Sequence, residues 1–335
     1  MRAIRITDVN RIEMQELPIP EAKAGEVLVQ VRMAALNHRD VWIKKGQYAG
    51  LKFPFTPGSD GAGTVVSCGD GVTKDWMGKE VIINPSLDWG RNERAQSQRF
   101  SILGLPRDGT FAEFVTVPAS NLVNRPEWLS WQESAALPLA GLTAWRVVST
   151  RARLKKGERV LITGIGGGVA LLALRFARAL GIDVWVTSSS DEKIARAVSL
   201  GASGGVNYTL PNWAQEASGA VPALFDVIID GAGGPEFDRL LDVCAPGGRV
   251  VVYGATRGNV PELAMRKIFM KQASILGSTM GSQKDFHSMM EFVSEQRIRP
   301  VVSEEFTFAR APEAFALLER GNQFGKIVLS ITKGD

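Results

Sequence analysis

The sequence predicts an α/β protein that combines a doubly wound parallel sheet with a separate domain of mainly antiparallel strands. From about residue 126, short apolar runs alternate with amphipathic segments of helical length, whereas the residues before it form short β-branched runs broken by Gly, Pro and Asn. The chain also has 335 residues, more than one hydrophobic core usually supports. We therefore expect a first domain over 1–125, a second over 126–275, and a return to the first over 276–335.

The first predicted domain contains apolar runs of strand length, among them EVLVQVRMAAL, GAGTVVSCG and KEVIINP. Turn residues separate these runs, which favours antiparallel strands in a barrel-like arrangement. The stretch from Pro85 to Gly109 is polar and rich in arginine, so we expect a long surface loop there.

The second predicted domain begins with a helical segment, SWQESAALPLAGLTAWRVV, and then repeats a strand–helix order. The strand RVLITG is followed by the helix VALLALRFARALG, the strand DVWVTSS and the helix DEKIARAVSLGA. Strands alternating with helices of this length predict parallel βαβ units, which DVIIDGAGG and GGRVVVYGAT continue. After a helix around 312–320, the run KIVLSI is expected to return to the first domain.

Composition restricts the class of protein. The net charge is +4 and no run of like charges forms a tail, so the sequence does not favour a nucleic-acid partner. Cys68 and Cys244 lie far apart, which argues against a disulfide framework and a cysteine metal site. No apolar run approaches the roughly 18 residues of a membrane span, and the first residues hold no apolar signal core. These features favour a cytoplasmic protein without a membrane partner.

A glycine-rich turn, GIGGGVA at 164–170, follows the strand RVLIT and opens into a helix. Backbone N–H groups and the dipole at a helix start bind phosphate, and glycine lets a pyrophosphate approach closely. The close-approach glycine is either Gly166, with Val169 in the third position, or Gly167, with Ala170; we favour the second. The strand–turn–helix context predicts a dinucleotide-binding Rossmann domain. The cofactor-binding residues expected from this turn are Gly167, Gly168 and Val169.

The next strand ends in Ser188, Ser189 and Ser190, where NAD-binding domains usually carry Asp or Glu to hold the ribose hydroxyls. Without a carboxylate, a 2′-phosphate is not repelled, and serine hydroxyls with Lys193 can donate to it. The same serines could simply cap the helix that starts near Asp191. The pattern favours NADPH as the cofactor.

Several longer stretches resemble the medium-chain dehydrogenase/reductase superfamily, and in particular its zinc-less branch of quinone oxidoreductases and enoyl reductases. They are GEVLVQV, ALNHRDVWIKKGQY, PGSDGAGTV, GTFAEFVTVP, ALPLAGLTAW, the glycine turn, TSSSDEK, LGA followed by VNY, and NQFGKIVLS. The resemblance implies that the first domain is a GroES-like, β-barrel-type catalytic domain and that the second is the Rossmann domain.

The resemblance also implies where the site residues lie. Asn37, Ser59 and Ala140 stand where zinc alcohol dehydrogenases carry their catalytic ligands, so no metal site is expected. Asn37 and Tyr48 correspond to residues of the substrate pocket and are the catalytic candidates. The resemblance assigns Thr143 to the nicotinamide, Lys193 and Tyr208 to the 2′-phosphate, Gly254 to the cofactor cleft, and Lys326 to a phosphate. The strand end adds Ser188 and Ser189 to the expected 2′-phosphate site.

Without a metal, the oxygen that gains charge during hydride transfer needs hydrogen-bond donors. We expect a zinc-independent, NADPH-dependent reductase of a quinone or small α,β-unsaturated carbonyl compound, with Tyr48 and Asn37 as donors. Tyr48 could instead only anchor its loop. The alternatives are an enoyl-thioester reductase, suggested by GQYAG, and a cofactor-binding protein with an RNA-binding or structural role. The resemblance further implies a homodimer.

The residues at the three ligand positions predict metal independence. Exhaustive chelation should leave the reductase activity unchanged, and elemental analysis should find no stoichiometric zinc. Activity that is lost on chelation and restored by zinc would contradict this expectation.

Overall fold

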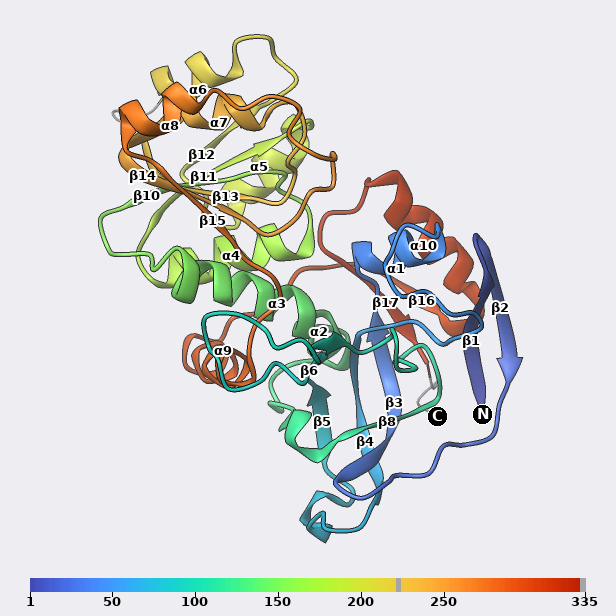
Figure 1. Ribbon diagram of the computed structural model, residues 1–335. Helices are drawn as coiled ribbons and strands as arrows, with labels where there is room; N and C mark the ends of the chain where they lie inside the picture. Colours follow the sequence, from blue (N-terminus) through green and yellow to red (C-terminus); the bar gives the residue numbers. More distant parts are fainter. Residues whose placement is uncertain (221–223, 332–335) are drawn as a thin grey trace. The chain divides into compact units, whose positions relative to one another are not determined.

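The computed structural model describes residues 1–220 and 224–331, which form two compact units. The first unit comprises residues 1–140 and the segment from Gly281 onward, and the second comprises Gly141–Met280. Figure 1 shows the order of helices and strands in each. The second unit therefore begins at 141 and ends at 280, and not at 126 and 275 as predicted. Residues 126–140 belong to the first unit because helix α2 packs on its strands β3 and β4.

The first unit is built on a sheet with strand order β16-β17-β3-β4-β5-β9, in which β8 also pairs with β3. Only β16 and β17 run parallel among these described strands. The elements of the unit are β1 (Arg2–Asp8), β2 (Arg11–Glu16), β3 (Glu26–Ala35), α1 (His38–Lys44), β4 (Asp60–Cys68), η1 (Lys74–Trp76), β5 (Glu80–Ile83), β6 (Ser86–Leu87), β7 (Ser101–Ile102), β8 (Phe114–Pro118), η2 (Ala119–Asn121), β9 (Leu122–Asn124), α2 (Trp131–Ala136), α9 (Gln283–Gln296), β16 (Val302–Thr307), η4 (Phe308–Arg310), α10 (Ala311–Arg320) and β17 (Lys326–Ser330).

The central strand of this sheet is β3, whose apolar residues are buried on both of its faces. The three predicted strands EVLVQVRMAAL, GAGTVVSCG and KEVIINP are β3, β4 and β5. Residues 85–109 are not wholly irregular, because β6 and β7 pair within them and Trp89 and Leu103 are buried. A loop that buries apolar side chains is held in place by them.

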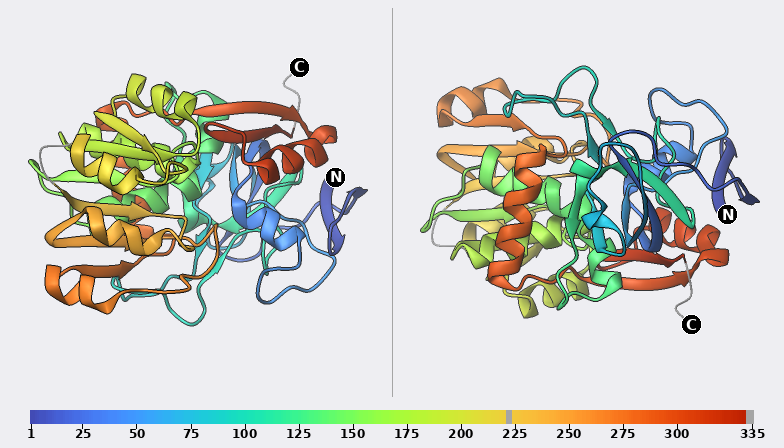
Figure 2. Two further views of the ribbon diagram at one scale, coloured as in Figure 1. Left: turned by 90° about the horizontal axis from the view of Figure 1, so that it is seen from above. Right: turned by 90° about the horizontal axis from the view of Figure 1, so that it is seen from below.

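The C-terminal segment completes the first unit. Strand β17 pairs antiparallel with β3, with Leu329 opposite Ala34, and Figure 2 shows β16, β17 and α10 beside the N-terminal strands. Phe315 of α10 packs edge-on against Phe111, with ring centroids 6.0 Å apart. The predicted return of KIVLSI to the first domain is confirmed.

The second unit holds a parallel sheet with strand order β12-β11-β10-β13-β14-β15. Figure 1 shows α4 on one face of this sheet and α6, α7 and α8 on the other. Its elements are η3 (Arg146–Arg151), β10 (Arg159–Ile162), α4 (Gly168–Ala179), β11 (Asp183–Ser188), α5 (Asp191–Ser199), β12 (Gly204–Asn207), α6 (Trp213–Ala220), β13 (Phe225–Asp230), α7 (Phe237–Val243), β14 (Cys244–Val252), α8 (Met265–Lys271) and β15 (Ser274–Gly277); α3 (Pro138–Trp145) spans the boundary between the units.

This strand order confirms the predicted doubly wound Rossmann sheet. The chain runs outward from β10 to β12 and then returns to β13 on the other side of β10. In sheets of this kind ligands bind outside the carboxyl ends of the strands, at the point where the order reverses. A cofactor is therefore expected to bind at the carboxyl ends of β10, β11, β13 and β14. None of the helices in residues 1–220 and 224–331 is long and apolar enough to cross a bilayer.

Candidate active site

The glycine turn after β10 has the geometry of a phosphate cradle. Gly164 has a φ of 62° and Gly166 a φ of 123°, values that favour glycine, and Gly167 is the N-cap residue of α4. A Cβ built on Gly164 or Gly167 would meet no heavy atom within 4 Å, so there is open space beside the turn. The first N–H groups of α4 have no acceptor within the helix. These features fit a cofactor pyrophosphate.

Burial distinguishes the two registers of the turn. The third glycine position of a dinucleotide-binding turn lies where the helix packs closely on the sheet. Ala170 is 1% exposed, whereas Val169 is only half-buried. This difference favours the register with Gly167 and Ala170.

The three serines after β11 have different environments. Ser188 is buried, and its hydroxyl accepts the N–H of Ser190 at 3.2 Å. The hydroxyl of Ser190 caps α5 by accepting the N–H of Lys193 at 3.3 Å. Ser189 is exposed. Local structure therefore occupies Ser188 and Ser190, as the capping interpretation requires, and Ser189 is the serine that faces solvent.

Tyr208 lies next to the end of β11, because its N–H donates to the carbonyl of Ser188 at 3.0 Å. The guanidinium of Arg257 stacks 5.4 Å from the centroid of the Tyr208 ring. Lys193, in the first turn of α5, has its pKa lowered by partial burial and then by the charge of Arg196. Arg257 was not predicted from the sequence, where its signal is a basic residue just beyond the strand GGRVVVYGAT.

The ends of β13 and β14 carry two polar residues, the buried Asp230 and the half-buried Tyr253, that the sequence patterns also missed. Asp230 accepts the Thr163 hydroxyl at 2.6 Å and the N–H of Gly233 at 2.9 Å, and burial raises the pKa of its carboxyl. Burial, followed by the charge of Asp230, raises the pKa of Tyr253. A charged residue ending the apolar run DVIID is the signal that could have identified Asp230.

Two further cofactor candidates lie in the second unit. A Cβ on Gly254, just after β14, would stand 3.0 Å from the carbonyl oxygen of Gly231, so the backbone is closely approached there. Thr143 is buried in α3, and its hydroxyl lies 3.9 Å from the sulfur of Met280.

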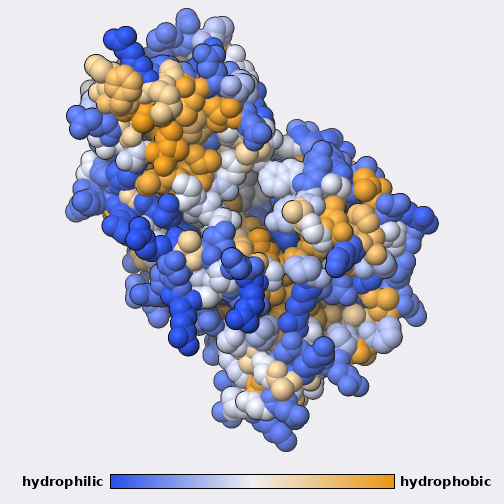
Figure 3. All heavy atoms as spheres, viewed as in Figure 1, coloured by the Kyte–Doolittle hydropathy of each residue, from blue (hydrophilic) through white to orange (hydrophobic). Residues whose placement is uncertain are grey.

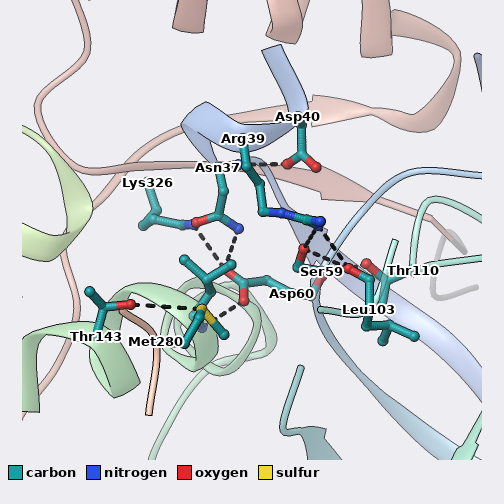
Figure 4. A network of polar contacts seen from close by, with 11 residues as sticks. Asn37, Arg39, Asp40, Ser59, Asp60, Leu103, Thr110, Thr143, Met280 and Lys326 are labelled. Carbon is teal, nitrogen blue, oxygen red and sulfur yellow. Dashed lines mark hydrogen bonds and ion pairs between the residues drawn. The ribbon is translucent and has the colours of Figure 1, made fainter. Parts of the chain in front are cut away.

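In the first unit, a buried cluster joins Asn37, Asp60 and Lys326 (Figure 4). The Lys326 ammonium donates to Asn37 Oδ1 at 2.6 Å and to Asp60 Oδ2 at 2.9 Å, while Asn37 Nδ2 donates to the same carboxylate oxygen at 2.9 Å. The other oxygen of Asp60 accepts the N–H of Leu139 at 2.7 Å. Lys326 is 4% exposed and Asp60 is 0% exposed. The two opposite charges compensate each other away from water.

This cluster bears on the role that the family resemblance assigned to Lys326. That resemblance implied a contact with a cofactor phosphate. The ammonium is bound to a carboxylate and an amide within the first unit, and its side chain is almost completely buried. In this arrangement Asp60 compensates the charge of Lys326, and the phosphate contact stays a prediction.

Arg39 of α1 and Ser59 form a second group of polar contacts. Arg39 Nη1 donates to the Ser59 hydroxyl at 2.6 Å and to the carbonyl of Leu103 at 2.9 Å. The Ser59 hydroxyl donates to the same carbonyl at 2.7 Å. Figure 4 shows the Arg39 side chain reaching toward these two partners.

Tyr48 combines an anchored ring with an available hydroxyl. Its ring lies 5.1 Å from the Arg39 guanidinium carbon and packs against a small cluster of Ile6, Ile43, Phe55 and Leu105. No residue of the part of the chain that the structure describes hydrogen-bonds the Tyr48 hydroxyl. The ring therefore anchors its loop, and the hydroxyl remains able to donate to a ligand.

The positions of the expected zinc ligands hold groups that do not suit a metal. Asn37 binds an ammonium, Ser59 binds a guanidinium, and Ala140 has no ligating atom. Within residues 1–220 and 224–331, no group of three His, Cys, Asp or Glu side chains could hold a metal ion. His38 and His287 are both exposed.

Asp40 is a buried acid beside this site. Its carboxylate accepts the N–H of Asn37 at 2.8 Å and so closes the first turn of α1, but its other oxygen has no partner among the described residues. Burial raises the pKa of Asp40 to about 6, although the charges of Arg39 and Lys326 oppose the shift.

Two family profiles match this chain. The family profile described as alcohol dehydrogenase GroES-like domain matches residues 23–127, and the profile described as zinc-binding dehydrogenase matches residues 168–295. The zinc-type alcohol dehydrogenase-like protein YogA of Leptosphaeria maculans is 38% identical, over 96% of this chain and 94% of its own.

Two other proteins bear on the activity. The quinone oxidoreductase of Rattus norvegicus is 29% identical, over 98% of this chain and 97% of its own. A crystal structure described as an NAD-dependent alcohol dehydrogenase superposes with a TM-score of 0.94 at 38% identity, covering 99% of this chain and 100% of its own.

Replacing Asp40 by Asn should stabilise the protein in a pH-dependent way. The carboxyl has a pKa of about 6 in the folded chain and an ordinary value of 3.8. The native state therefore binds the proton more tightly, and wild-type stability falls as the pH rises between these two values. The stability advantage of Asp40→Asn should grow over this interval, to roughly 3 kcal/mol at most above about pH 7. Denaturant unfolding at about pH 4 and pH 7.5 measures it, and an equal difference at both pH values would contradict the assignment.

Proposed function

Because the chain belongs to the medium-chain dehydrogenase/reductase family, we propose that it is a zinc-independent, NADPH-dependent oxidoreductase that delivers hydride to a quinone or a small α,β-unsaturated carbonyl compound. The family consists of nicotinamide-dependent oxidoreductases, and the finer proposal rests on the site. The observation that carries it is the buried cluster of Asn37, Asp60 and Lys326. Its ammonium and the nearby Arg39 guanidinium bind the side chains at two expected zinc-ligand positions, so the oxygens of Asn37 and Ser59 are already engaged and do not offer themselves to a metal ion.

Each unit supplies one part of this chemistry. When bound, the reduced nicotinamide supplies the hydride. The glycine turn before α4 offers backbone N–H groups to the pyrophosphate, and Gly167, the N-cap residue, leaves open space for its close approach. Asn37 Nδ2 and the Tyr48 hydroxyl donate to the substrate oxygen as it becomes negative, which lowers the barrier in the way that an oxyanion hole does.

The choice of acceptor is supported by the quinone oxidoreductase relative and by the donors in the first unit. Hydride addition to a quinone or to the β-carbon of an enone leaves negative charge on an oxygen, and hydrogen-bond donors suffice to stabilise it. The test is a steady-state screen with NADPH across quinones, enones, aldehydes and enoyl thioesters. We expect turnover of quinones or enones by the metal-free protein. Turnover of enoyl thioesters alone would support the alternative reductase, and turnover of simple alcohols only with added zinc would overturn the proposal.

The proposed preference for NADPH rests on Ser189, Lys193, Tyr208 and Arg257 around the end of β11. A new carboxylate at the exposed Ser189 would repel a 2′-phosphate, so Ser189→Asp should weaken NADPH binding tenfold or more, or about 1.4 kcal/mol, and leave NADH binding unchanged or tighter. Arg257→Ala should act in the same direction. Titration of cofactor fluorescence measures both.

The matched control for these variants is Arg266→Ala, since Arg266 is exposed on α8 and distant in sequence from β11. It should leave both affinities unchanged. The similar solved structure is described as NAD-dependent, so the wild-type measurement is decisive. A wild-type protein that binds NADH more tightly than NADPH contradicts the proposed cofactor.

Tyr48→Phe isolates the hydroxyl, because phenylalanine keeps the ring that packs beneath Arg39. If Tyr48 donates to the developing oxyanion, kcat and kcat/KM should fall together by about 10- to 1000-fold, with NADPH affinity unchanged. Steady-state kinetics at saturating cofactor measure this. An unchanged kcat with an altered KM would mean that Tyr48 is only a wall of the substrate pocket.

We also propose a homodimer formed through the β15 edge of the second unit. Strand β15 ends the described sheet, and the neighbouring helix α8 exposes Met265, Phe269 and Met270, with Phe269 65% exposed. Figure 3 shows apolar surface over this part of the unit. A sheet edge beside exposed apolar side chains is suited to pairing with a second copy.

Light scattering at micromolar concentration tests this dimer. The wild-type protein should have twice the mass of one chain, and Ile275→Lys on the edge strand should reduce it to one. Val198→Lys, a change at an exposed apolar residue of α5, is the control and should leave the mass unchanged. A monomeric wild type would exclude the dimer.

A further inference from the structure

The amide of Asn37 has its orientation fixed by two opposite charges. Its oxygen accepts from the Lys326 ammonium at 2.6 Å, and its nitrogen donates to the Asp60 carboxylate at 2.9 Å. The reverse orientation would place the NH₂ group against the ammonium and the carbonyl against the carboxylate. The position of the NH₂ group therefore follows from charge complementarity.

The same contacts polarise the amide. A cation at the amide oxygen draws electron density from the nitrogen through the amide resonance, which makes its hydrogens stronger donors. One Nδ2 hydrogen is used by Asp60, and the second is bound by no residue within 1–220 and 224–331. Asp60 is itself held by Leu139 through its other oxygen, so the cluster does not depend on a ligand for its arrangement.

We propose that Lys326 is a positioning residue that activates Asn37 as the donor to the substrate oxygen. This inference rests on the proposed function for the role of Asn37, but the polarisation of the amide does not. It replaces the expected phosphate contact of Lys326 with a role in the chemical step. A metal ion would stabilise the substrate oxygen by direct contact. The Lys326 ammonium does so indirectly, through the Asn37 amide.

The activity test compares Lys326→Met with Asn37→Ala and with the double variant. Lys326→Met should lower kcat by about 10- to 100-fold at saturating NADPH, with the dissociation constant of NADPH unchanged within twofold. Because Lys326 acts through Asn37, the double variant should lose no more activity than Asn37→Ala alone. A raised NADPH dissociation constant with unchanged kcat would show that Lys326 binds the cofactor, and losses that multiply would show that the two residues act independently.

Lys326→Met leaves the buried Asp60 carboxylate without its partner, so the variant could fail to fold. The neutral pair Asp60→Asn with Lys326→Met removes both charges, and the same loss of kcat with unchanged NADPH affinity is expected of it. The matched control is Lys44→Met, which removes another lysine of the first unit that is paired with a carboxylate, Glu319. The control should keep wild-type kcat.

A spectroscopic readout separates this inference from the proposed activity. In protein labelled with ¹⁵N-asparagine, the side-chain resonances of Asn37 are identified by their loss in Asn37→Ala. Removing the charge of Lys326, alone or in the neutral pair, should move the Asn37 NH₂ protons to lower frequency, whereas Lys44→Met should leave them in place. Unmoved resonances would overturn the inference even in an active enzyme. Moved resonances would support the polarisation even if no quinone or enone were reduced.

Discussion

The buried ion pair of Asp60 and Lys326 connects the parts of the first unit that carry chemistry. It joins the start of β4 to the start of β17 across 266 residues of sequence, and through Asn37 and Leu139 it also fixes the N-terminal ends of α1 and α3. Taking two charges out of water is costly, and loss of one partner from such a pair typically costs 3–5 kcal/mol. The pair is therefore best understood as a device that specifies the position of Asn37.

The proposed function assigns the binding of the cofactor to the second unit and the chemistry at the substrate to the first. For the proposed cofactor, the second unit offers backbone groups at the glycine turn and the side chains around the end of β11. The first unit offers side chains whose donor strength is set by neighbouring charges, as Lys326 does for Asn37. Under the proposed function, cofactor preference and catalytic rate should therefore respond to separate substitutions.

Features that depend on local periodicity were predictable from the sequence, and features that depend on distant contacts were not. The parallel sheet and the glycine turn follow from apolar spacing and turn residues. The unit boundary after Ala140 was displaced because α2 packs on β3 and β4, a tertiary contact that a helical pattern does not reveal. Lys326 finds its carboxylate 266 residues away, and Arg257 finds the Tyr208 ring across a strand crossover. Neither pair can be predicted from the spacing of residues along the chain.

The measurement that tests this account most directly is a crystal structure of the protein with oxidised cofactor and a bound quinone or enone, recorded with anomalous data at the zinc absorption edge. The account predicts that the Lys326 ammonium stays between Asn37 and Asp60, that the substrate oxygen lies within about 3 Å of Asn37 Nδ2 and the Tyr48 hydroxyl, and that no anomalous peak lies beside them. A zinc ion about 2.0–2.2 Å from side-chain oxygens of the first unit, with the substrate oxygen bound to it, would contradict the account.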